Sequence, residues 1–215
     1  MPLRIAPSLA SAPMPHLSRV IADLEAARAD SIHFDVEDGS FTPVMTLGTK
    51  IIADLRPLTR LPFDVHLMMV NPEWILPELA AYGANRISVH YEACPYPRRV
   101  LRQIVSLGAQ AGLAFNPATP IPDLSYLSQY LSFIVVLTTE PEMPDCPFLP
   151  EVLEKVREGK QAAGQARCEW VVDGGVTAEN ISQIQKAGAD IVVVGRAVFK
   201  EGKITENMAA LRAAA

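Results

Sequence analysis

The sequence predicts an α/β fold, a single (β/α)8 TIM barrel that occupies residues 1–215. Short apolar runs alternate with amphipathic segments along the whole chain, which is the pattern of repeated β–α units. The apolar runs show little polar alternation, as expected for parallel strands that are buried on both faces. The length of 215 residues suits one small barrel, and no linker-like or low-complexity segment interrupts the alternation.

The expected strands are the short runs richest in Val, Ile and other apolar residues. They are Leu3–Ala6, Ser31–Val36, Pro62–Leu67, Arg86–His90, Gln110–Phe115, Phe133–Thr138, Glu169–Val172 and Asp190–Val194. Eight strands are the number that closes a barrel of this type. An open, doubly wound sheet is the alternative that the same alternation allows.

The expected helices are the amphipathic segments that follow each strand. Several begin at a capping residue or a proline, as at Asn71 before Pro72 and at Thr177 before Ala178, and several end at glycine, as at Gly188. The segments are Pro15–Ala29, Thr49–Leu58, Pro72–Tyr82, Pro97–Ser106, Ile121–Ser128, Pro150–Ala163, Ala178–Ala187 and Ile204–Ala214.

Composition and charge argue against nucleic acid and membrane as partners. The chain is 49% apolar and carries a formal net charge of −5, and no apolar run approaches the ~18 residues that cross a bilayer. The N-terminal LRIAPS fits a first strand better than a signal peptide. The three cysteines, Cys94, Cys146 and Cys168, lack metal-finger spacing, which fits a reduced, cytoplasmic compartment.

Titratable residues stand where several predicted strands end. His33 and Asp35 lie in SIHFDVEDG, His66 in FDVHLM and Asp173 in WVVDGG. The carboxyl ends of barrel strands share one mouth, so these side chains are expected to meet. Two imidazoles and two carboxylates can hold one divalent metal, and two carboxylates can move protons on opposite sides of a substrate. This combination indicates chemistry at a carbon next to a carbonyl.

A structural pair is the alternative for His33 and Asp35, because a buried histidine is often hydrogen-bonded to a carboxylate. Asp64 and His66 repeat the same spacing on the next strand, and Asp173 adds a further carboxylate. A cluster of titratable groups in a cleft favours the functional interpretation.

An anion site is expected beside this cluster. Asp173 is followed by Gly174 and Gly175, and Gly195 is followed by Arg196. Glycines let backbone N–H groups approach a ligand, and the loops after strands seven and eight of such barrels often bind phosphate. The guanidinium of Arg196 suits a phosphate, although a salt bridge at the rim is the alternative for it.

Across almost its whole length the chain resembles the ribulose-phosphate 3-epimerase family. The similar segments, in order, are IAPSLAS, HFDVEDGSFTP, DVHLM, VHYEA, GLAFNPATP, FLPEVLEKV, VDGGV and VGRAVF. The resemblance implies a barrel of the ribulose-phosphate-binding type and one divalent metal, which is Zn, Fe, Mn or Co. It also implies an isomerase of the pentose phosphate pathway that forms a homo-oligomer and acts on a small ketose phosphate.

The resemblance also assigns residue roles. His33, Asp35, His66 and Asp173 become the metal ligands, and Asp35 and Asp173 become the acid/base pair. This pair inverts C3 of D-ribulose 5-phosphate to give D-xylulose 5-phosphate, through an enediolate that the metal stabilises. The implied substrate-binding residues are Ser8, Gly174, Gly175 and Gly195. His66, Met68 and Arg196 are expected to bind substrate as well, because they lie near the same strand ends.

The chain departs from the family in the loop after the sixth strand. Where the family has a glycine-rich PGFGGQ, residues 139–148 read TEPEMPDCPF. Pro144 and Pro147 remove N–H donors, and Glu140, Glu142 and Asp145 would each repel a phosphate dianion by on the order of 1 kcal/mol.

Four single-residue departures lie elsewhere, and they leave alternative functions open. Glu37 and Leu137 stand where the family has Met, Val44 where it has Asn, and Arg196 where it has Ser or another small residue. One alternative is an epimerase or isomerase of another small sugar phosphate, and another is a non-catalytic barrel that binds metal or sugar phosphate. The sequence disfavours membership of the related sugar-phosphate decarboxylases, because the segment from Asp35 to Ser40 lacks the Lys and the second Asp of their D-x-K-x-x-D motif.

Overall fold

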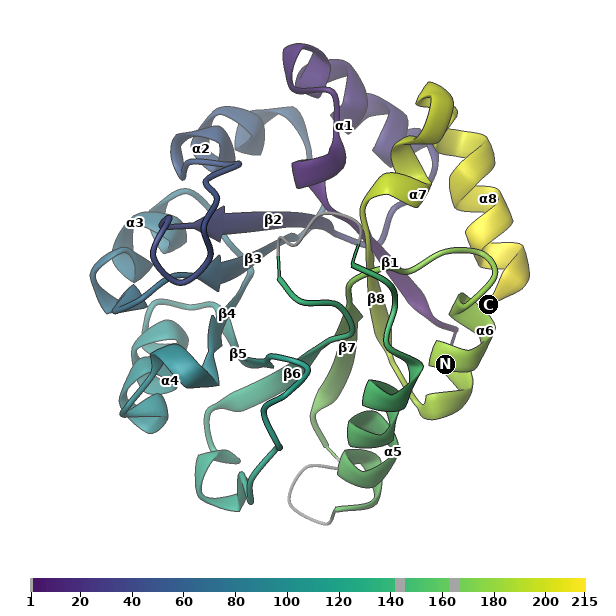
Figure 1. Cartoon of the computed structure of the whole chain (residues 1–215). Helices are drawn as coiled ribbons and strands as arrows, with labels where there is room; N and C mark the ends of the chain where they lie inside the picture. Colours follow the sequence, from purple (N-terminus) through teal and green to yellow (C-terminus); the bar gives the residue numbers. More distant parts are fainter. Residues whose placement is uncertain (1, 142–145, 163–166) are drawn as a thin grey trace.

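A computed structural model describes residues 2–141, 146–162 and 167–215 of the chain. In this structure a ring of parallel strands is surrounded by helices (Figure 1). The strands are β1 (Arg4–Pro7), β2 (Ile32–Glu37), β3 (Phe63–Met68), β4 (Arg86–His90), β5 (Gln110–Phe115), β6 (Leu131–Leu137), β7 (Glu169–Asp173) and β8 (Ile191–Val194). The predicted (β/α)8 barrel is confirmed.

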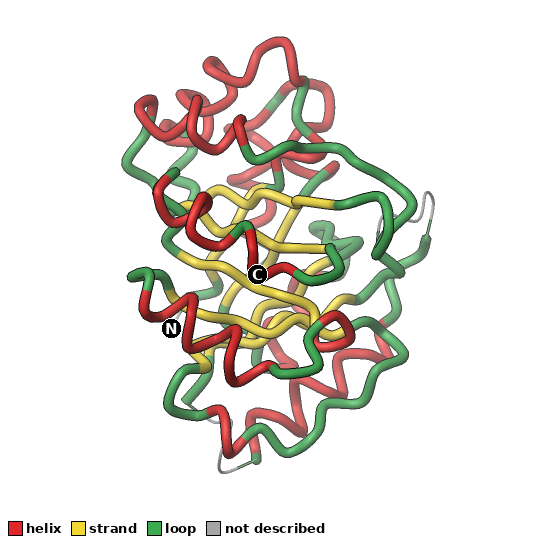
Figure 2. Tube along the Cα trace, turned by 90° about the vertical axis from the view of Figure 1, so that its left-hand side faces the viewer, coloured by secondary structure: helices red, strands yellow, loops and turns green. Residues whose placement is uncertain are grey.

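Every strand pairs in parallel with its neighbours in the order β1-β8-β7-β6-β5-β4-β3-β2. A parallel bridge between Ser8 and His33 joins β1 to β2 and brings the two ends of this sheet together. The side view shows the strands in the middle of the molecule, between layers of helix (Figure 2). The carboxyl ends of all strands therefore face one mouth, as the sequence analysis expects.

The helices lie outside the strands and cover the outer face of the sheet (Figure 1). They are α1 (Leu17–Ala26), α2 (Lys50–Leu55), α3 (Leu76–Ala81), α4 (Pro97–Ser106), α5 (Leu153–Gln161), α6 (Ile181–Ala187), α7 (Arg196–Phe199) and α8 (Ile204–Ala214). Among the described residues, none of these helices is long and apolar enough to cross a membrane.

Two apolar cores result from this arrangement, one between strands and helices and one inside the ring. The inner cluster is Ala6, Ala114, Phe133, Val135, Leu137, Val171, Ile191 and Val193. A Cβ atom at Gly112 would lie 2.3 Å from the Phe133 ring, so glycine on β5 makes room for the largest inner side chain. The small and large residues of the inner cluster fill the interior of the barrel, and two of them, Leu137 and Val193, also line the cavity at its mouth.

The predicted strands all occur, and both ends of each lie within two residues of the expected position. Two helices, Pro97–Ser106 and Ile204–Ala214, occur with the predicted ends. Other predicted helices begin or end with 3-10 turns, as in Pro72–Trp74 before α3. The last residue of the predicted helix Pro150–Ala163 lies outside the described residues.

The prediction of a helix at Ile121–Ser128 is wrong. Only a 3-10 turn at Ser125–Leu127 forms there. The segment contains Pro122, which cannot donate the backbone hydrogen bond of a helix interior. The Asp123 carboxylate instead accepts hydrogen bonds from the backbone and hydroxyl of Ser125, at 2.8 and 2.9 Å. The short α7 after β8 was not expected.

Candidate active site

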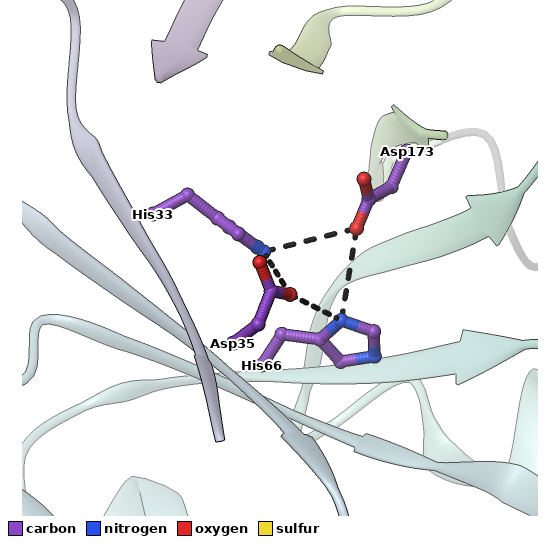
Figure 3. Close-up of side chains that lie close together, drawn as sticks. All are labelled: His33, Asp35, His66 and Asp173. Atoms are coloured by element: carbon purple, nitrogen blue, oxygen red, sulfur yellow. Dashed lines mark hydrogen bonds and ion pairs between the residues drawn. The ribbon is translucent and has the colours of Figure 1, made fainter. Parts of the chain in front are cut away.

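The four predicted ligands meet at the mouth of the barrel. His33 and Asp35 project from β2, His66 from β3, and Asp173 stands at the end of β7 (Figure 3). One nitrogen or carboxylate oxygen from each residue lies within 4.8 Å of the corresponding atom of every other. Both histidines are 0% exposed, and the Asp173 side chain is 15% exposed, so the group opens to solvent mainly beside Asp173.

His33 is held from behind by a buried carboxylate. Its Nδ1 lies 3.0 Å from Oδ2 of Asp64, while its Nε2 lies 3.2 Å from Oδ1 of Asp35 and 3.7 Å from Oδ2 of Asp173. Burial alone would lower the pKa of His33, but Asp35 and Asp64 raise it well above its usual range. A carboxylate behind a histidine is a common way to orient a metal ligand.

His66 leaves one buried nitrogen without a hydrogen bond. Its Nδ1 lies 3.4 Å from Oδ1 of Asp35 and 3.6 Å from Oδ2 of Asp173, and no described residue satisfies it. Burial would lower the pKa of His66, but the carboxylates of Asp173 and Asp35 close to Nδ1 raise it to about 9. A buried polar atom without a partner is costly, so this nitrogen indicates a missing ligand.

The donor set fits a divalent cation. Two imidazole nitrogens and two carboxylates converge, which is a mixture that transition metals and zinc accept. A cation would give Nδ1 of His66 a partner. It would also replace the ring protons that the raised pKa values of His33 and His66 favour when no cation is bound. The cluster could therefore hold one metal ion.

Asp35 is the more firmly held of the two carboxylates. Its Oδ2 accepts a 2.6 Å hydrogen bond from the hydroxyl of Ser8, a predicted substrate-binding residue. Burial would raise the pKa of Asp35, but His33 and His66 hold it far below its usual range, so the group is an anion. Asp35 and Asp173 approach from β2 and β7, on different sides of the site (Figure 3).

A cavity of about 680 Å³ adjoins Asp35 and Asp173. The predicted substrate-binding residues that line it are Ser8, Met68, Gly174, Gly175, Gly195 and Arg196. His66 does not line this cavity and faces the site only through its Nδ1 atom. The site residues thus come together as expected, although their roles stay predictions.

The glycines shape the wall of the cavity. Gly174 has φ +112°, and a Cβ atom there would lie 2.4 Å from the Thr139 hydroxyl. A Cβ atom at Gly195 would lie 2.5 Å from the Ser11 hydroxyl. Gly174 therefore requires glycine, because its positive φ and the Thr139 backbone leave no room for a side chain, whereas a Cβ atom at Gly195 would require the Ser11 hydroxyl to move.

Arg196 is exposed at the start of α7 and lines the cavity. Within the described residues it forms no ion pair, which leaves its guanidinium available to an anionic ligand. Glu140 lines the same cavity. The other acidic positions of the loop, Glu142 and Asp145, lie outside the described residues, as does Pro144.

Three of the methionines differ in their surroundings. Met68 is 2% exposed at the end of β3 and lines the cavity, whereas Met69 belongs to the outer core. Met45 is 75% exposed. Of the three, Met68 alone lies where a substrate could contact it.

Glu37 has a structural partner that the sequence did not indicate. Its buried carboxylate accepts hydrogen bonds from the backbone N–H of Thr46 at 2.9 Å and from the Thr46 hydroxyl at 2.6 Å. These bonds anchor the loop between β2 and α2. Val44 of that loop and Leu137 of β6, the other departures from the family pattern, line the cavity.

The residues behind the two histidines have no role that the sequence alone indicates. Asp64 lies behind His33, and His90 and Glu92 lie behind His66. Burial lowers the pKa of His90 to about 4. Burial would raise the pKa of Glu92, but hydrogen bonds, the first from His90, hold it at about 2. The spacing of two between His90 and Glu92, like that of His33 and Asp35, was the available signal.

Comparison with known proteins agrees with this geometry. Residues 4–199 match the model of the Ribulose-phosphate 3 epimerase family. The chain is 40% identical to ribulose-phosphate 3-epimerase of Synechocystis, over 97% of this chain and 92% of that protein. It is 37% identical to the Bacillus subtilis enzyme of that name, over 98% of each chain.

Solved structures share the fold at low identity. A tryptophan synthase complex from Pyrococcus furiosus gives a TM-score of 0.68 at 18% identity, over 97% of this chain and 96% of that chain. Orotidine 5'-phosphate decarboxylase from Pyrococcus horikoshii gives 0.68 at 17% identity, over 98% of this chain and 97% of that chain. These matches support the barrel and carry no information on activity.

Proposed function

Because this chain belongs to the ribulose-phosphate 3-epimerase family of isomerases, we propose that it inverts C3 of D-ribulose 5-phosphate to give D-xylulose 5-phosphate. The observation that carries the proposal is the placement of Asp35 and Asp173 against one cavity. Inversion needs a base on one face of the carbon and an acid on the other. Two carboxylates from β2 and β7 meet that need.

The proton moves in two steps. One carboxylate removes the C3 proton, and the electron pair of that bond passes to the C2 carbonyl to give an enediolate. The other carboxylate, in its protonated form, returns a proton to the opposite face of C3. Which of Asp35 and Asp173 acts first depends on the epimer that is bound, so the two exchange roles between the forward and reverse reactions.

His33, Asp35, His66 and Asp173 are the proposed ligands of one divalent cation, which is Zn, Fe, Mn or Co. The lone Nδ1 atom of His66 supports this assignment. When bound, such a cation supplies positive charge that stabilises developing charge on the substrate oxygens. The Ser8 hydroxyl keeps Asp35 turned toward the site through its 2.6 Å hydrogen bond.

The phosphate is proposed to lie beside Gly174, Gly175, Gly195 and Arg196, which all line the cavity. Glu140 lines the same cavity and opposes a dianion by on the order of 1 kcal/mol at a wet ~4 Å separation. This carboxylate is the specific observation that favours a second candidate, an epimerase of a small sugar phosphate with a different anionic end.

Metal reconstitution tests the proposal. Chelator-treated protein should regain turnover of D-ribulose 5-phosphate with Zn, Fe, Mn or Co, and the regain should saturate at one ion per chain. Asp35→Asn and Asp173→Asn proteins loaded in the same way should stay inactive. Full turnover by either variant would show that the carboxylate pair does not move the proton.

A panel of other ketose phosphates separates the two candidate substrates. The enzyme should show its highest kcat/KM with D-ribulose 5-phosphate. A higher kcat/KM for another sugar phosphate, with the same dependence on Asp173, would favour the second candidate. Absence of turnover with every member, despite bound metal, would indicate a binding protein.

A further inference from the structure

We propose that His90 and Glu92 are positioning residues that keep the ring proton of His66 on Nε2 and so leave Nδ1 free to bind the metal. The inference rests on the proposed metal centre and concerns residues that do not touch the metal or the substrate. It goes beyond the ligand set because it names what fixes the orientation and the tautomer of one ligand.

The three side chains form a line that leads away from the site. His66 Nε2 lies 2.9 Å from Nε2 of His90, and Nδ1 of His90 lies 3.1 Å from Oε2 of Glu92. The two imidazoles stack with their centroids 4.9 Å apart, and the ring of Phe41 lies 4.4 Å from that of His90. His66 and His90 are both 0% exposed, so water does not compete for these bonds.

The chemistry of the three groups fixes the direction of each hydrogen bond. A carboxylate accepts and never donates, so the proton between His90 and Glu92 belongs to Nδ1 of His90. A neutral His90 then has a bare Nε2, which can only accept. The donor in the 2.9 Å contact is therefore Nε2 of His66, which leaves Nδ1 of that ring as the nitrogen that a metal would bind in place of a proton.

The far end of the line is anchored by a loop. Oε1 of Glu92 accepts a 2.9 Å hydrogen bond from the backbone N–H of Asn116. The ammonium of Lys155 donates to the carbonyl oxygens of Asn116, Pro117 and Thr119 at 2.9, 2.8 and 2.6 Å. The position of Glu92, and with it the direction of the whole line, is thus set by backbone groups.

The two histidine ligands are oriented by different means. His33 has a carboxylate, Asp64, directly behind it, whereas His66 has an imidazole between itself and the carboxylate. An imidazole can accept or donate, so only the carboxylate of Glu92 fixes the direction in which His66 and His90 donate their hydrogen bonds. A glutamine in place of Glu92 can donate to Nδ1 of His90, and this would allow the opposite direction and place a proton on Nδ1 of His66.

The test measures Zn affinity by competition with a chromophoric chelator, using the full chain. His90→Phe keeps an aromatic ring against Phe41 but removes the acceptor, and His90→Gln restores an acceptor near the position of Nε2. Glu92→Gln preserves the shape of the side chain, but the amide can donate as well as accept, so the direction of the hydrogen bond to His90 is no longer fixed. Glu73→Gln, at an exposed ion pair with Arg99, makes the same charge change elsewhere and is the matched control.

We expect His90→Phe and Glu92→Gln to weaken Zn binding by about 10–100-fold, as loss of a partner behind a metal ligand commonly does. His90→Gln should recover most of the affinity, and Glu73→Gln should bind as the wild type. Ring 15N spectra of the Zn-loaded wild type should show the His66 proton on Nε2. If His90→Phe does not fold, Glu92→Gln alone decides the result.

Wild-type affinity in Glu92→Gln would overturn the proposal, as would a His66 proton on Nδ1 in the loaded wild type. Equal loss in His90→Gln and His90→Phe would also overturn it, because that result indicates packing rather than an acceptor. Failure of the wild type to bind any Zn, Fe, Mn or Co would instead contradict the proposed metal centre, so the two failures are distinguishable.

Discussion

The two ends of the barrel use buried charge in different ways. At the mouth, the carboxylates of Asp35 and Asp173 lie beside the imidazoles of His33 and His66, and Nδ1 of His66 has no hydrogen bond. At the base, Glu169 accepts from Arg86 and from Arg4, each at 2.5 Å. The base therefore pairs its carboxylate with two guanidinium groups of the protein, whereas the mouth brings two carboxylates and two imidazoles together where they could hold a cation.

Asp64 connects the two ends. Its Oδ2 lies 3.0 Å from His33, and its Oδ1 lies 3.5 Å from Nε of Arg86. The Arg86 guanidinium lies over the Phe133 ring, 4.0 Å from its centroid, inside the barrel. The difference teaches that the base helps to hold Asp64 behind His33, and that the mouth presents the groups of the proposed reaction.

Removal of a carboxylate at the mouth should have the largest effect on activity. Asp173→Asn is expected to lower kcat by about 10²–10⁴-fold, because it removes one acid/base group and leaves the shape of the site unchanged. Thermal unfolding should change little. Steady-state kinetics with measured metal content would check this, and Asp54→Asn, at an exposed position, is the control. An unchanged kcat in Asp173→Asn would show that the proton is not moved at the mouth.

A change at the base should instead act on stability. Arg86→Met leaves Asp64 and Glu169 without their shared guanidinium and is expected to cost about 3–5 kcal/mol of unfolding free energy, as for other broken buried pairs. Arg4→Met removes a side chain that is 41% exposed, so about 0–1 kcal/mol is expected. Denaturant unfolding would measure both losses of unfolding free energy. Equal losses for Arg86→Met and Arg4→Met would contradict the contrast between the buried and the exposed arginine.

A substitution of Arg196 tests the proposed phosphate site at the mouth. Arg196→Ala should raise KM by about 10–100-fold, which corresponds to the ~1.5–3 kcal/mol of a hydrogen bond to a charged group, and should lower kcat much less. The phosphate would contact this side chain equally in the ground state and the transition state. Kinetics with D-ribulose 5-phosphate would check the split, and unchanged KM would remove Arg196 from the site.

The pH dependence of stability should show the smallest effect. Burial would raise the pKa of Glu169, but Arg86 and Arg4 lower it below its ordinary value of 4.5. Its stabilising contribution is therefore complete above pH 4.5 and disappears as the pH falls through the lowered folded-state pKa. The unfolding free energies of wild type and Glu169→Gln should differ at pH 7 and converge in acid. A difference that grows in acid would contradict a lowered pKa of Glu169 in the folded state.

Much of the fold followed from the sequence because strands buried on both faces are continuous apolar runs. The helix predicted at Ile121–Ser128 failed because side-chain hydrogen bonds of Asp123 and the proline within the segment favour a turn. The meeting of His33, Asp35, His66 and Asp173 could be predicted since barrel strands end at one mouth.

The residues behind the ligands could not be assigned from the sequence. Asp64, His90 and Glu92 lie on or beside the same strands as the ligands, and only the register between strands shows which nitrogen each one faces. Arg86 and Glu169 are 83 positions apart, and nothing in either segment indicates the other. Pairings of this kind depend on side-chain direction across the barrel interior.

The most direct measurement is exchange of the C3 hydrogen with solvent. Protein loaded with zinc or iron is mixed with D-ribulose 5-phosphate in D₂O, and NMR follows C3–H and D-xylulose 5-phosphate. We predict deuterium at C3 together with formation of the epimer, and neither in Asp173→Asn. Epimer without deuterium, or no exchange by fully metal-loaded protein, would contradict proton transfer by the two carboxylates at the mouth.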